Sequence, residues 1–230
     1  MKVLAIEASG NVASVAVANE EKILAEITTD SKKTHSQTLL PMIDEVLKKS
    51  ESSVADMDFI AISKGPGSFT GLRIGSATAK GMAFAANKKI VEVGTLEAMA
   101  YGVSDIDAVI CPMLDARNKN VFTGFYKVKA DGALEEVDEQ QAITLDEAID
   151  KLNSFDKVVL LGDGADAYRE ILMEKLTASY RFVPAHLNRQ RAGMVATLGF
   201  RYYNEGKAID SDKHAPTYLR KSQAERMREQ

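Results

Sequence analysis

The chain of 230 residues contains one cysteine, no tryptophan and three histidines. The lone cysteine, Cys111, excludes an internal disulfide, and its apolar neighbours indicate a buried strand. No stretch is apolar enough to cross a bilayer, and the first residues lack the charged region and apolar run of an export signal. These absences predict a globular protein of the cytoplasm without a membrane partner.

An excess of positive charge is also lacking, because 29 Lys and Arg stand against 33 Asp and Glu, for a net charge of −4. A protein that binds a phosphate backbone without help carries an excess of Lys and Arg on its binding surface. We therefore expect this chain to reach nucleic acid through a partner. Cations gather only near the end of the chain, at Lys213, Arg220, Lys221, Arg226 and Arg228. A solvated tail is the favoured interpretation.

What the chain does have is clear periodicity. In the first half, alternation predicts strands over 3–6, 12–17 and 23–28, with turns at Gly10-Asn11 and Asn19-Glu20. Apolar residues at helical spacing predict an amphipathic helix over 35–49. A buried strand over 59–63, a helix near 71–86, a strand over 90–93 and a short helix over 96–101 follow.

The same order begins again after Asp105, which indicates a weak internal repeat. Strands predicted over 108–114 and 121–128 flank a turn, and an acid, Glu7 or Asp115, ends the first strand of each half. A helix over 145–152, a strand over 157–161 and helices over 165–176 and 191–204 indicate a second α/β unit. We expect two related lobes, 1–104 and 105–230, joined near 102–107. Whether the last helix and the tail pack back on the first lobe stays open.

The segment from Gly65 to Gly75, GPGSFTGLRIG, lies between a predicted strand and a predicted helix. Glycines permit positive φ there, and a helix start offers free N–H groups that could hold an anion. The alternative is a tight turn in which Ser68 or Thr70 caps the helix. The spacing is neither GxGxxG nor GxxxxGK[ST], so the common nucleotide fingerprints do not apply.

That segment, preceded by the strand FIAIS, resembles the signature of the TsaB (YeaZ) family. The segments VLAIEAS, HSQTLLPMID, VGTLEAMA, LDARNKNVF and APTYLRKSQAE are similar to family segments as well, so the resemblance spans nearly the whole chain. It implies the two-lobed α/β fold shared by actin, Hsp70 chaperones and sugar kinases, which is a duplicated ribonuclease H-like architecture.

The resemblance also implies a function. TsaB proteins are non-catalytic partners of TsaD, which transfers threonylcarbamoyl to adenosine 37 of tRNAs that read ANN codons, with the ATPase TsaE as a further component. We accordingly expect a heterodimer with TsaD, a homodimer when TsaD is absent, and contact with tRNA through the complex. No catalytic residue, metal or cofactor is expected in this chain alone, whereas the complex uses ATP.

Two departures from the family pattern concern the hairpin turns. Glu7 stands where an Asp is common, and Asn118-Lys119-Asn120 replaces the more usual Arg-Gly-Glu. We therefore interpret Glu7 and Asp115 as structural acids at hairpin turns rather than as magnesium or phosphate ligands.

None of the single candidate residues has the neighbours in sequence that metal binding or nucleophilic catalysis would require. His35 has no metal ligand four residues away on either side, so the HxxxH pair of TsaD is absent and a helix-start or surface role is favoured. His186 and His214 lie in predicted loops and suggest no chemistry. Ser9 and Ser68 lie outside a G-x-S-x-G elbow, so peptidase activity is not expected.

The helix near 71–86 carries the most specific prediction, because Gly71, Gly75 and Ala79 recur every four residues and form a small-residue ridge. Glycine inside a helix costs up to about 1 kcal/mol relative to alanine, so close packing is expected to offset it. From spacing alone, the ridge fits the protein's own sheet or an intermolecular helix bundle equally well.

The resemblance favours the bundle, because TsaB proteins pair through the helices of their first lobe. The expected partner interface is Gly71, Leu72, Arg73, Ile74, Gly75, Thr78, Ala79 and Met82, next to a signature loop of Gly65, Pro66, Gly67, Ser68, Phe69 and Thr70.

Three hypotheses of function follow. The first is a scaffold that orders the active site of TsaD. The second is an independent ATP-dependent enzyme, a kinase or hydrolase, that uses Glu7, Ser9 and Asp115 around a phosphate; the fold permits this without establishing it. The third is a homodimeric regulator that acts without TsaD.

Overall fold

A computed structural model describes residues 1–31, 33–103 and 107–220. The chain separates into two units, one of Met1–Ala98 with Gln190–Thr217 and one of Met99–Arg189 with residues 218–220. The predicted ranges 1–104 and 105–230 differ from these units, because the segment Gln190–Thr217, which contains the last helix, returns to the first unit. Some residues that the sequence analysis singled out lie outside the described residues. They are part of the predicted joining segment 102–107 and the tail cations Lys221, Arg226 and Arg228.

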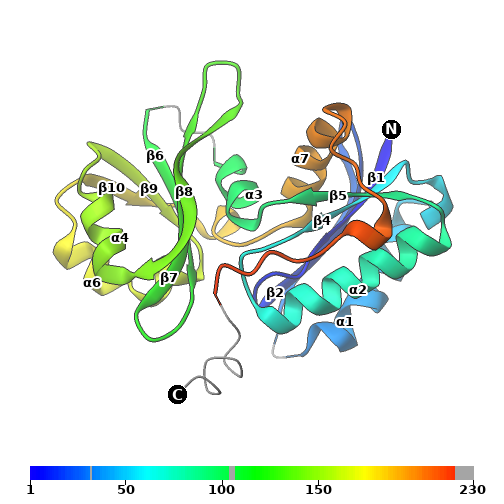
Figure 1. The fold of residues 1–230 in the computed structure, drawn as a ribbon, viewed down its shortest axis with the longest axis horizontal. Helices are drawn as coiled ribbons and strands as arrows, with labels where there is room; N and C mark the ends of the chain where they lie inside the picture. The colour runs from blue at the N-terminus through cyan, green and yellow to red at the C-terminus, as the bar shows by residue number, and fades with distance from the viewer. Residues whose placement is uncertain (32, 104–106, 221–230) are drawn as a thin grey trace. The chain divides into compact units, whose positions relative to one another are not determined.

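The first unit is built on a mixed sheet in the order β3-β2-β1-β4-β5 (Figure 1). Its strands are β1 (Lys2–Glu7), β2 (Val12–Asn19), β3 (Ile23–Asp30), β4 (Phe59–Ser63) and β5 (Lys89–Val93). The central strand β1 pairs antiparallel with β2 and parallel with β4. β1, β2 and β4 are almost entirely buried, as expected of strands with helices on both faces of the sheet.

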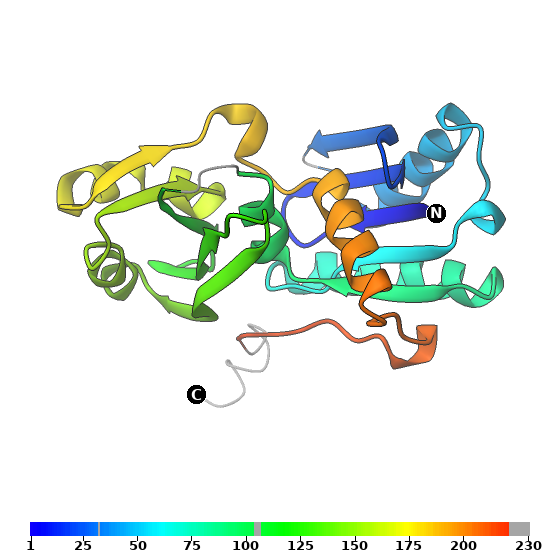
Figure 2. The ribbon, with the colours of Figure 1, turned by 90° about the horizontal axis from the view of Figure 1, so that it is seen from above.

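Helices α1 (His35–Lys49) and α2 (Phe69–Ala85) cover one face of this sheet, and α7 (Ala192–Asn204) covers the other (Figure 2). Side chains alternate between the two faces along a strand. Ile60 and Ile62 of β4 therefore join the core beneath α1 and α2, while Phe59 stacks on Tyr203 of α7 with ring centroids 4.5 Å apart. The prediction of α1 over 35–49 is confirmed.

The second unit has a sheet in the order β10-β9-β6-β7-β8. Its strands are β6 (Val109–Asp115), β7 (Asn120–Val128), β8 (Leu134–Thr144), β9 (Lys157–Leu161) and β10 (Ser179–Phe182). β6 pairs antiparallel with β7 and parallel with β9, which repeats the arrangement around β1. The weak internal repeat of the sequence is thus a duplicated sheet topology.

The remaining elements differ in part from the predictions. The helices are α3 (Thr95–Tyr101), α4 (Leu145–Leu152), α5 (Asp163–Ala167) and α6 (Arg169–Lys175), with short 3-10 turns η1 (Val54–Asp56), η2 (Ala185–Leu187) and η3 (Ser211–Lys213). One helix was predicted over 165–176, but Tyr168, at φ −112° and ψ 18°, leaves the helical region and divides it. The strands β8 and β10 were not predicted. Among the described residues, no helix is long and apolar enough to span a bilayer.

Candidate functional site

The signature loop joins β4 to α2 and packs on the turn between β1 and β2. An added Cβ at Gly67 would lie 2.0 Å from the carbonyl oxygen of Ser9, and one at Gly65, where φ is 110°, would lie 2.6 Å from the carbonyl oxygen of Thr217. Real Cβ atoms do not approach backbone oxygens so closely, so only glycine fits either position. The glycines of this loop are explained by close backbone packing.

Ser68 is the N-cap of α2, as one of the two sequence interpretations predicted. Its Oγ accepts a hydrogen bond from the Gly71 N–H at 3.3 Å. Its own N–H donates to the Ser9 carbonyl at 2.6 Å. Two of the N–H groups that an anion would need at this helix start are therefore engaged within the chain.

The small-residue ridge of α2 faces the sheet of its own unit, which corrects the predicted partner interface at these positions. An added Cβ at Gly71 would lie 2.2 Å from the Ala8 carbonyl oxygen, and one at Gly75 would lie 3.0 Å from the Ala8 Cβ. Ala79 is fully buried in the core cluster of this unit, and Leu72 is buried as well. The glycines let α2 lie directly against the end of β1, so Gly71, Leu72, Gly75 and Ala79 are inaccessible to a partner.

The opposite side of α2 is open. Thr70, Arg73, Ala77 and Gly81 are exposed, and Ile74, Thr78 and Met82 are partly exposed. We call these seven residues the outer stripe of α2. Phe84 follows in the last turn with 82% of its surface exposed, and Leu40 of the neighbouring helix α1 is 57% exposed. Four residues of the predicted interface, Arg73, Ile74, Thr78 and Met82, belong to this outer stripe and stay a prediction.

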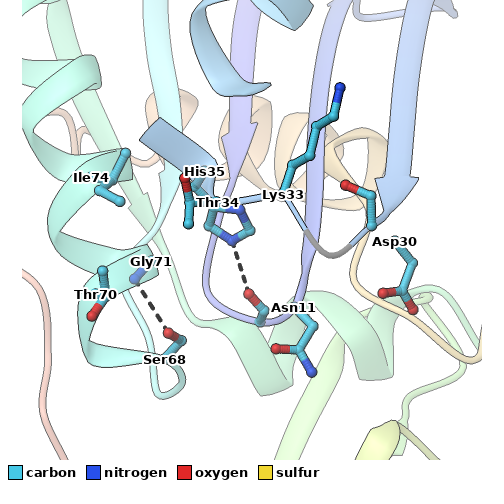
Figure 3. A pocket seen from close by; sticks show the side chains of 11 residues that line it. Asn11, Asp30, Lys33, Thr34, His35, Ser68, Thr70, Gly71 and Ile74 are labelled. Atoms are coloured by element: carbon cyan, nitrogen blue, oxygen red, sulfur yellow. Dashed lines mark hydrogen bonds between the residues drawn. The ribbon is translucent and has the colours of Figure 1, made fainter. Parts of the chain in front are cut away.

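A pocket of about 630 Å³ opens where the N-terminal ends of α1 and α2 meet the turn between β1 and β2. Its lining includes Asn11, Lys33, His35, Thr70 and Ile74. Figure 3 shows the His35 ring directed at the turn, whereas Lys33 points away from it. The pocket thus adjoins one end of the outer stripe.

His35 anchors the turn. Its Nε2 lies 2.9 Å from the Gly10 carbonyl oxygen, and because a carbonyl only accepts, Nε2 carries the hydrogen. The residue is the first of α1 and is buried, so the predicted helix-start role describes its position. Across the described ranges, no three His, Cys, Asp or Glu side chains form a group suited to a metal ion.

Glu7 and Asp115 both bind the turns that follow their strands. One Glu7 carboxylate oxygen accepts hydrogen bonds from the Ser9 N–H at 2.6 Å and the Ser9 hydroxyl at 2.5 Å. Burial raises the pKa of the Glu7 carboxyl, and the hydrogen bonds from Ser9 and Ser63 only partly oppose the shift. Asp115 of the second unit accepts from the Arg117 N–H at 2.8 Å and the Tyr168 hydroxyl at 3.0 Å.

Sequence reasoning missed a buried chain of hydrogen bonds around His214. Its Nε2 lies 2.8 Å from the Ser76 Oγ on α2, and its Nδ1 lies 2.7 Å from the Glu92 carboxylate on β5. The ammonium of Lys80 donates to the carbonyls of Asp212 and His214. These contacts hold residues 207–217, which we call the C-terminal strap, against α2 and β5. The partners are 138 and 122 residues away in sequence, so no local pattern could reveal them.

Comparison with known proteins decides the family. The family model described as "tRNA N6-adenosine threonylcarbamoyltransferase" (TsaD) matches residues 22–227. A Bacillus subtilis protein named "tRNA threonylcarbamoyladenosine biosynthesis protein TsaB" is 33% identical over 226 residues, which cover 98% of this chain and 96% of that protein. The chain belongs to the TsaB family.

Solved structures share the fold of this chain. YeaZ from Pseudomonas aeruginosa matches with a TM-score of 0.81 and 24% identity, over 95% of this chain and 99% of that one. The inorganic polyphosphate/ATP-glucomannokinase of an Arthrobacter strain matches with a TM-score of 0.52 at 9% identity, over 89% of this chain and 99% of that one. The predicted two-lobed, sugar-kinase-like α/β fold is confirmed.

Proposed function

We propose that the chain is a non-catalytic subunit in the biosynthesis of threonylcarbamoyladenosine in tRNA, and that it acts by binding a TsaD-family transferase. The observation that carries the proposal is the 33% identity to a TsaB protein over nearly the whole of both chains. A role in tRNA modification fits this relationship better than a role as a peptidase does. We place the chain in the cytoplasm, with TsaE as a further partner and with ATP consumed by the assembled complex.

The outer stripe of α2, together with Leu40 of α1, is the surface proposed for this partner. Each side chain of this surface is either small or apolar, apart from Arg73, whose guanidinium lies 3.9 Å from the ring centroid of Phe69. Small residues let a second helix approach closely, while Leu40 and Phe84 offer apolar area at its sides. The inward glycines fix the height of this face above the sheet.

The non-catalytic part of the proposal rests on how the acids are used. Glu7 is buried and receives hydrogen bonds from Ser9, so the carboxylate and hydroxyl of the ATP-dependent hypothesis are bonded to each other. Magnesium that holds a phosphate takes oxygen ligands from carboxylates, waters and the phosphate itself, and the Ser9 amide and hydroxyl already occupy Oε1 of Glu7. The observed bonds instead give them the task of shaping the turn on which the signature loop packs.

Ala77→Arg tests the interface, because Ala77 lies exposed in the middle of the outer stripe. Ala167→Arg, at an exposed alanine of the second unit, is the matched control. Binding to the TsaD-family protein is measured by titration calorimetry, and threonylcarbamoyladenosine in tRNA by mass spectrometry. We expect Ala77→Arg to weaken binding about tenfold or more, because a buried, unpaired arginine is costly, and the control to bind like the wild type.

Four outcomes would contradict the proposal or part of it. Modification activity of the purified chain alone would contradict a non-catalytic role, and failure of the wild type to bind the TsaD-family protein would contradict the partnership. Equal binding by both arginine variants would move the interface elsewhere. If Ala77→Arg disrupts only a homodimer, the homodimeric-regulator hypothesis is the better one.

A further inference from the structure

The turn between β6 and β7 has an unusual backbone. Arg117, Asn118 and Lys119 have φ values of 64°, 54° and 55°. The Asn120 N–H donates to the Arg117 carbonyl at 3.1 Å, which makes Asn118 and Lys119 the central residues of a tight hairpin turn. Positive φ at both central positions favours Asn followed by Gly. Asn118 fits that preference, but lysine stands where glycine is favoured, and Arg117 is strained in the same sense.

The two long side chains do not compensate for this strain within the protein. Arg117 and Lys119 are exposed. In the part of the chain that the structure describes, neither side chain forms a hydrogen bond or an ion pair. The backbone is held by hydrogen bonds from the Asn120 side-chain amide to the carbonyls of Arg117 and Asn118. Backbone held in such sparsely populated conformations occurs preferentially at functional sites. The feature that the turn gains from its two unusual residues is a pair of positive charges held at its tip.

A third cation joins them, and the neighbouring acids are already engaged. The Arg220 guanidinium donates to the Ala116 carbonyl at 2.8 Å, which ties it to the same turn. Asp115 accepts two hydrogen bonds from the turn and from Tyr168. Asp146 forms an ion pair with Lys175 at 2.7 Å. Hydrogen bonds from neutral donors leave the negative charge of Asp115 in place, while Lys175 offsets that of Asp146. The three cations still outnumber these acids, so the charge at the turn is predominantly positive.

We propose that the β6–β7 turn of the second unit, with Arg117, Lys119 and Arg220, binds the phosphate backbone of RNA. Arginine pairs with phosphate through a planar fork and lysine as a point charge, and both act without reading the base sequence. With a net charge of −4, the chain would contribute this contact to a larger complex. The choice of tRNA as the RNA rests on the proposed function.

The test uses the full chain bound to its TsaD-family partner and fluorescein-labelled tRNA, with anisotropy titrations at several salt concentrations. The double variant Arg117→Gln/Lys119→Gln removes two cations from the turn. Lys127→Gln/Lys129→Gln removes two exposed cations at the opposite end of β7 and is the matched control. Two lost phosphate contacts should reduce the slope of log K against log salt by about 1.4–1.8 and weaken binding roughly 25- to 60-fold near 0.1 M salt. The control should retain the wild-type slope.

Lys119→Gly separates charge from folding, because glycine relieves the strained position while removing the cation. This variant should unfold at a higher temperature than the wild type and still bind tRNA more weakly, whereas Lys119→Arg should retain binding. A wild-type salt slope in the double variant would overturn the proposal. So would unchanged RNA affinity with weaker binding of the partner protein, since the turn would then dock on an acidic protein surface. If no complex with the TsaD-family protein forms, the proposed function fails, and the same titrations on the chain alone still test the turn.

Discussion

Alanine substitutions at Gly71 and Gly81, two glycines of the same helix, should change stability in opposite directions. An added Cβ at Gly71 would lie 2.2 Å from the Ala8 carbonyl oxygen and 3.1 Å from the His35 Cδ2, whereas one at Gly81 meets nothing within 4 Å. The first contact involves backbone, which cannot rotate away. Gly71→Ala must therefore displace α2 from the end of β1, while Gly81→Ala adds a methyl group in open space.

The magnitudes follow from these two environments. Replacing an unhindered helical glycine by alanine stabilises a protein by up to about 1 kcal/mol. Overpacking a core costs about 1–3 kcal/mol and outweighs the helix-propensity gain where backbone is struck. For a chain of this size, 1 kcal/mol corresponds to about 2–4 °C in Tm. Gly81→Ala should therefore raise Tm by at most roughly 2–4 °C, and Gly71→Ala should lower it by roughly 2–12 °C.

Thermal unfolding followed by circular dichroism gives both shifts, and hydrogen exchange of the β1 and β4 amides assigns them to the first unit. Unchanged stability of Gly71→Ala would refute the close approach of α2 to Ala8. If that variant had wild-type stability and failed to bind the TsaD-family protein, the ridge of Gly71, Gly75 and Ala79 would face a partner, as the family resemblance predicts.

Three further predictions follow from buried groups. Because burial raises the pKa of Glu7, the folded state binds that proton more tightly, and stability falls as pH rises from the ordinary Glu value toward the raised pKa. Glu7→Gln removes this loss. Urea unfolding should therefore show the stability of Glu7→Gln relative to the wild type rising between about pH 4 and about pH 7, and a relative stability that stays constant or falls would contradict this. His214→Ala deletes one buried and one partly buried hydrogen bond, so it should cost about 1–3 kcal/mol and speed proteolysis of the C-terminal strap. His186→Ala, at an exposed position, should do neither, and equal proteolysis of the two variants would show that the strap is held elsewhere. Burial raises the pKa of the Cys111 thiol to about 12, so iodoacetamide should label it only in denaturant, and mass spectrometry showing native-state labelling would mean that β6 opens.

The elements that sequence reasoning found are those with strong one-sided patterns. The amphipathic spacing of α1 and the apolar run of β4 (Phe59–Ser63) gave bounds that the structure confirms. β8 escaped prediction because its segment, LEEVDEQQAIT, is rich in acids and only partly buried at the edge of its sheet. Charged edge strands of this kind protect a sheet against unwanted pairing. The same charged residues remove the apolar pattern from which a strand is predicted.

The candidate site was predictable in location but not in orientation. Spacing identified the ridge of Gly71, Gly75 and Ala79, yet close packing against a sheet and against another helix require the same small residues. The side that meets the sheet is decided by Ala8, more than sixty residues earlier in the chain. The same limit applies to His214, whose partners are assembled by the return of the chain to the first unit.

The two sides of α2 have separable roles, and this separation governs how mutations there are to be interpreted. Gly71 and Gly75 touch the end of β1, while Ala77 and Gly81 face outward. A larger residue on the inner side moves the whole helix and with it the outer stripe, because packed interiors transmit displacements instead of absorbing them. Loss of partner binding on mutation of Gly71 or Gly75 would thus arise without any contact between that residue and the partner. Only a variant that weakens binding at unchanged Tm identifies a contact residue, and Ala77 is an exposed position in the middle of α2 where a side chain can be enlarged away from the sheet.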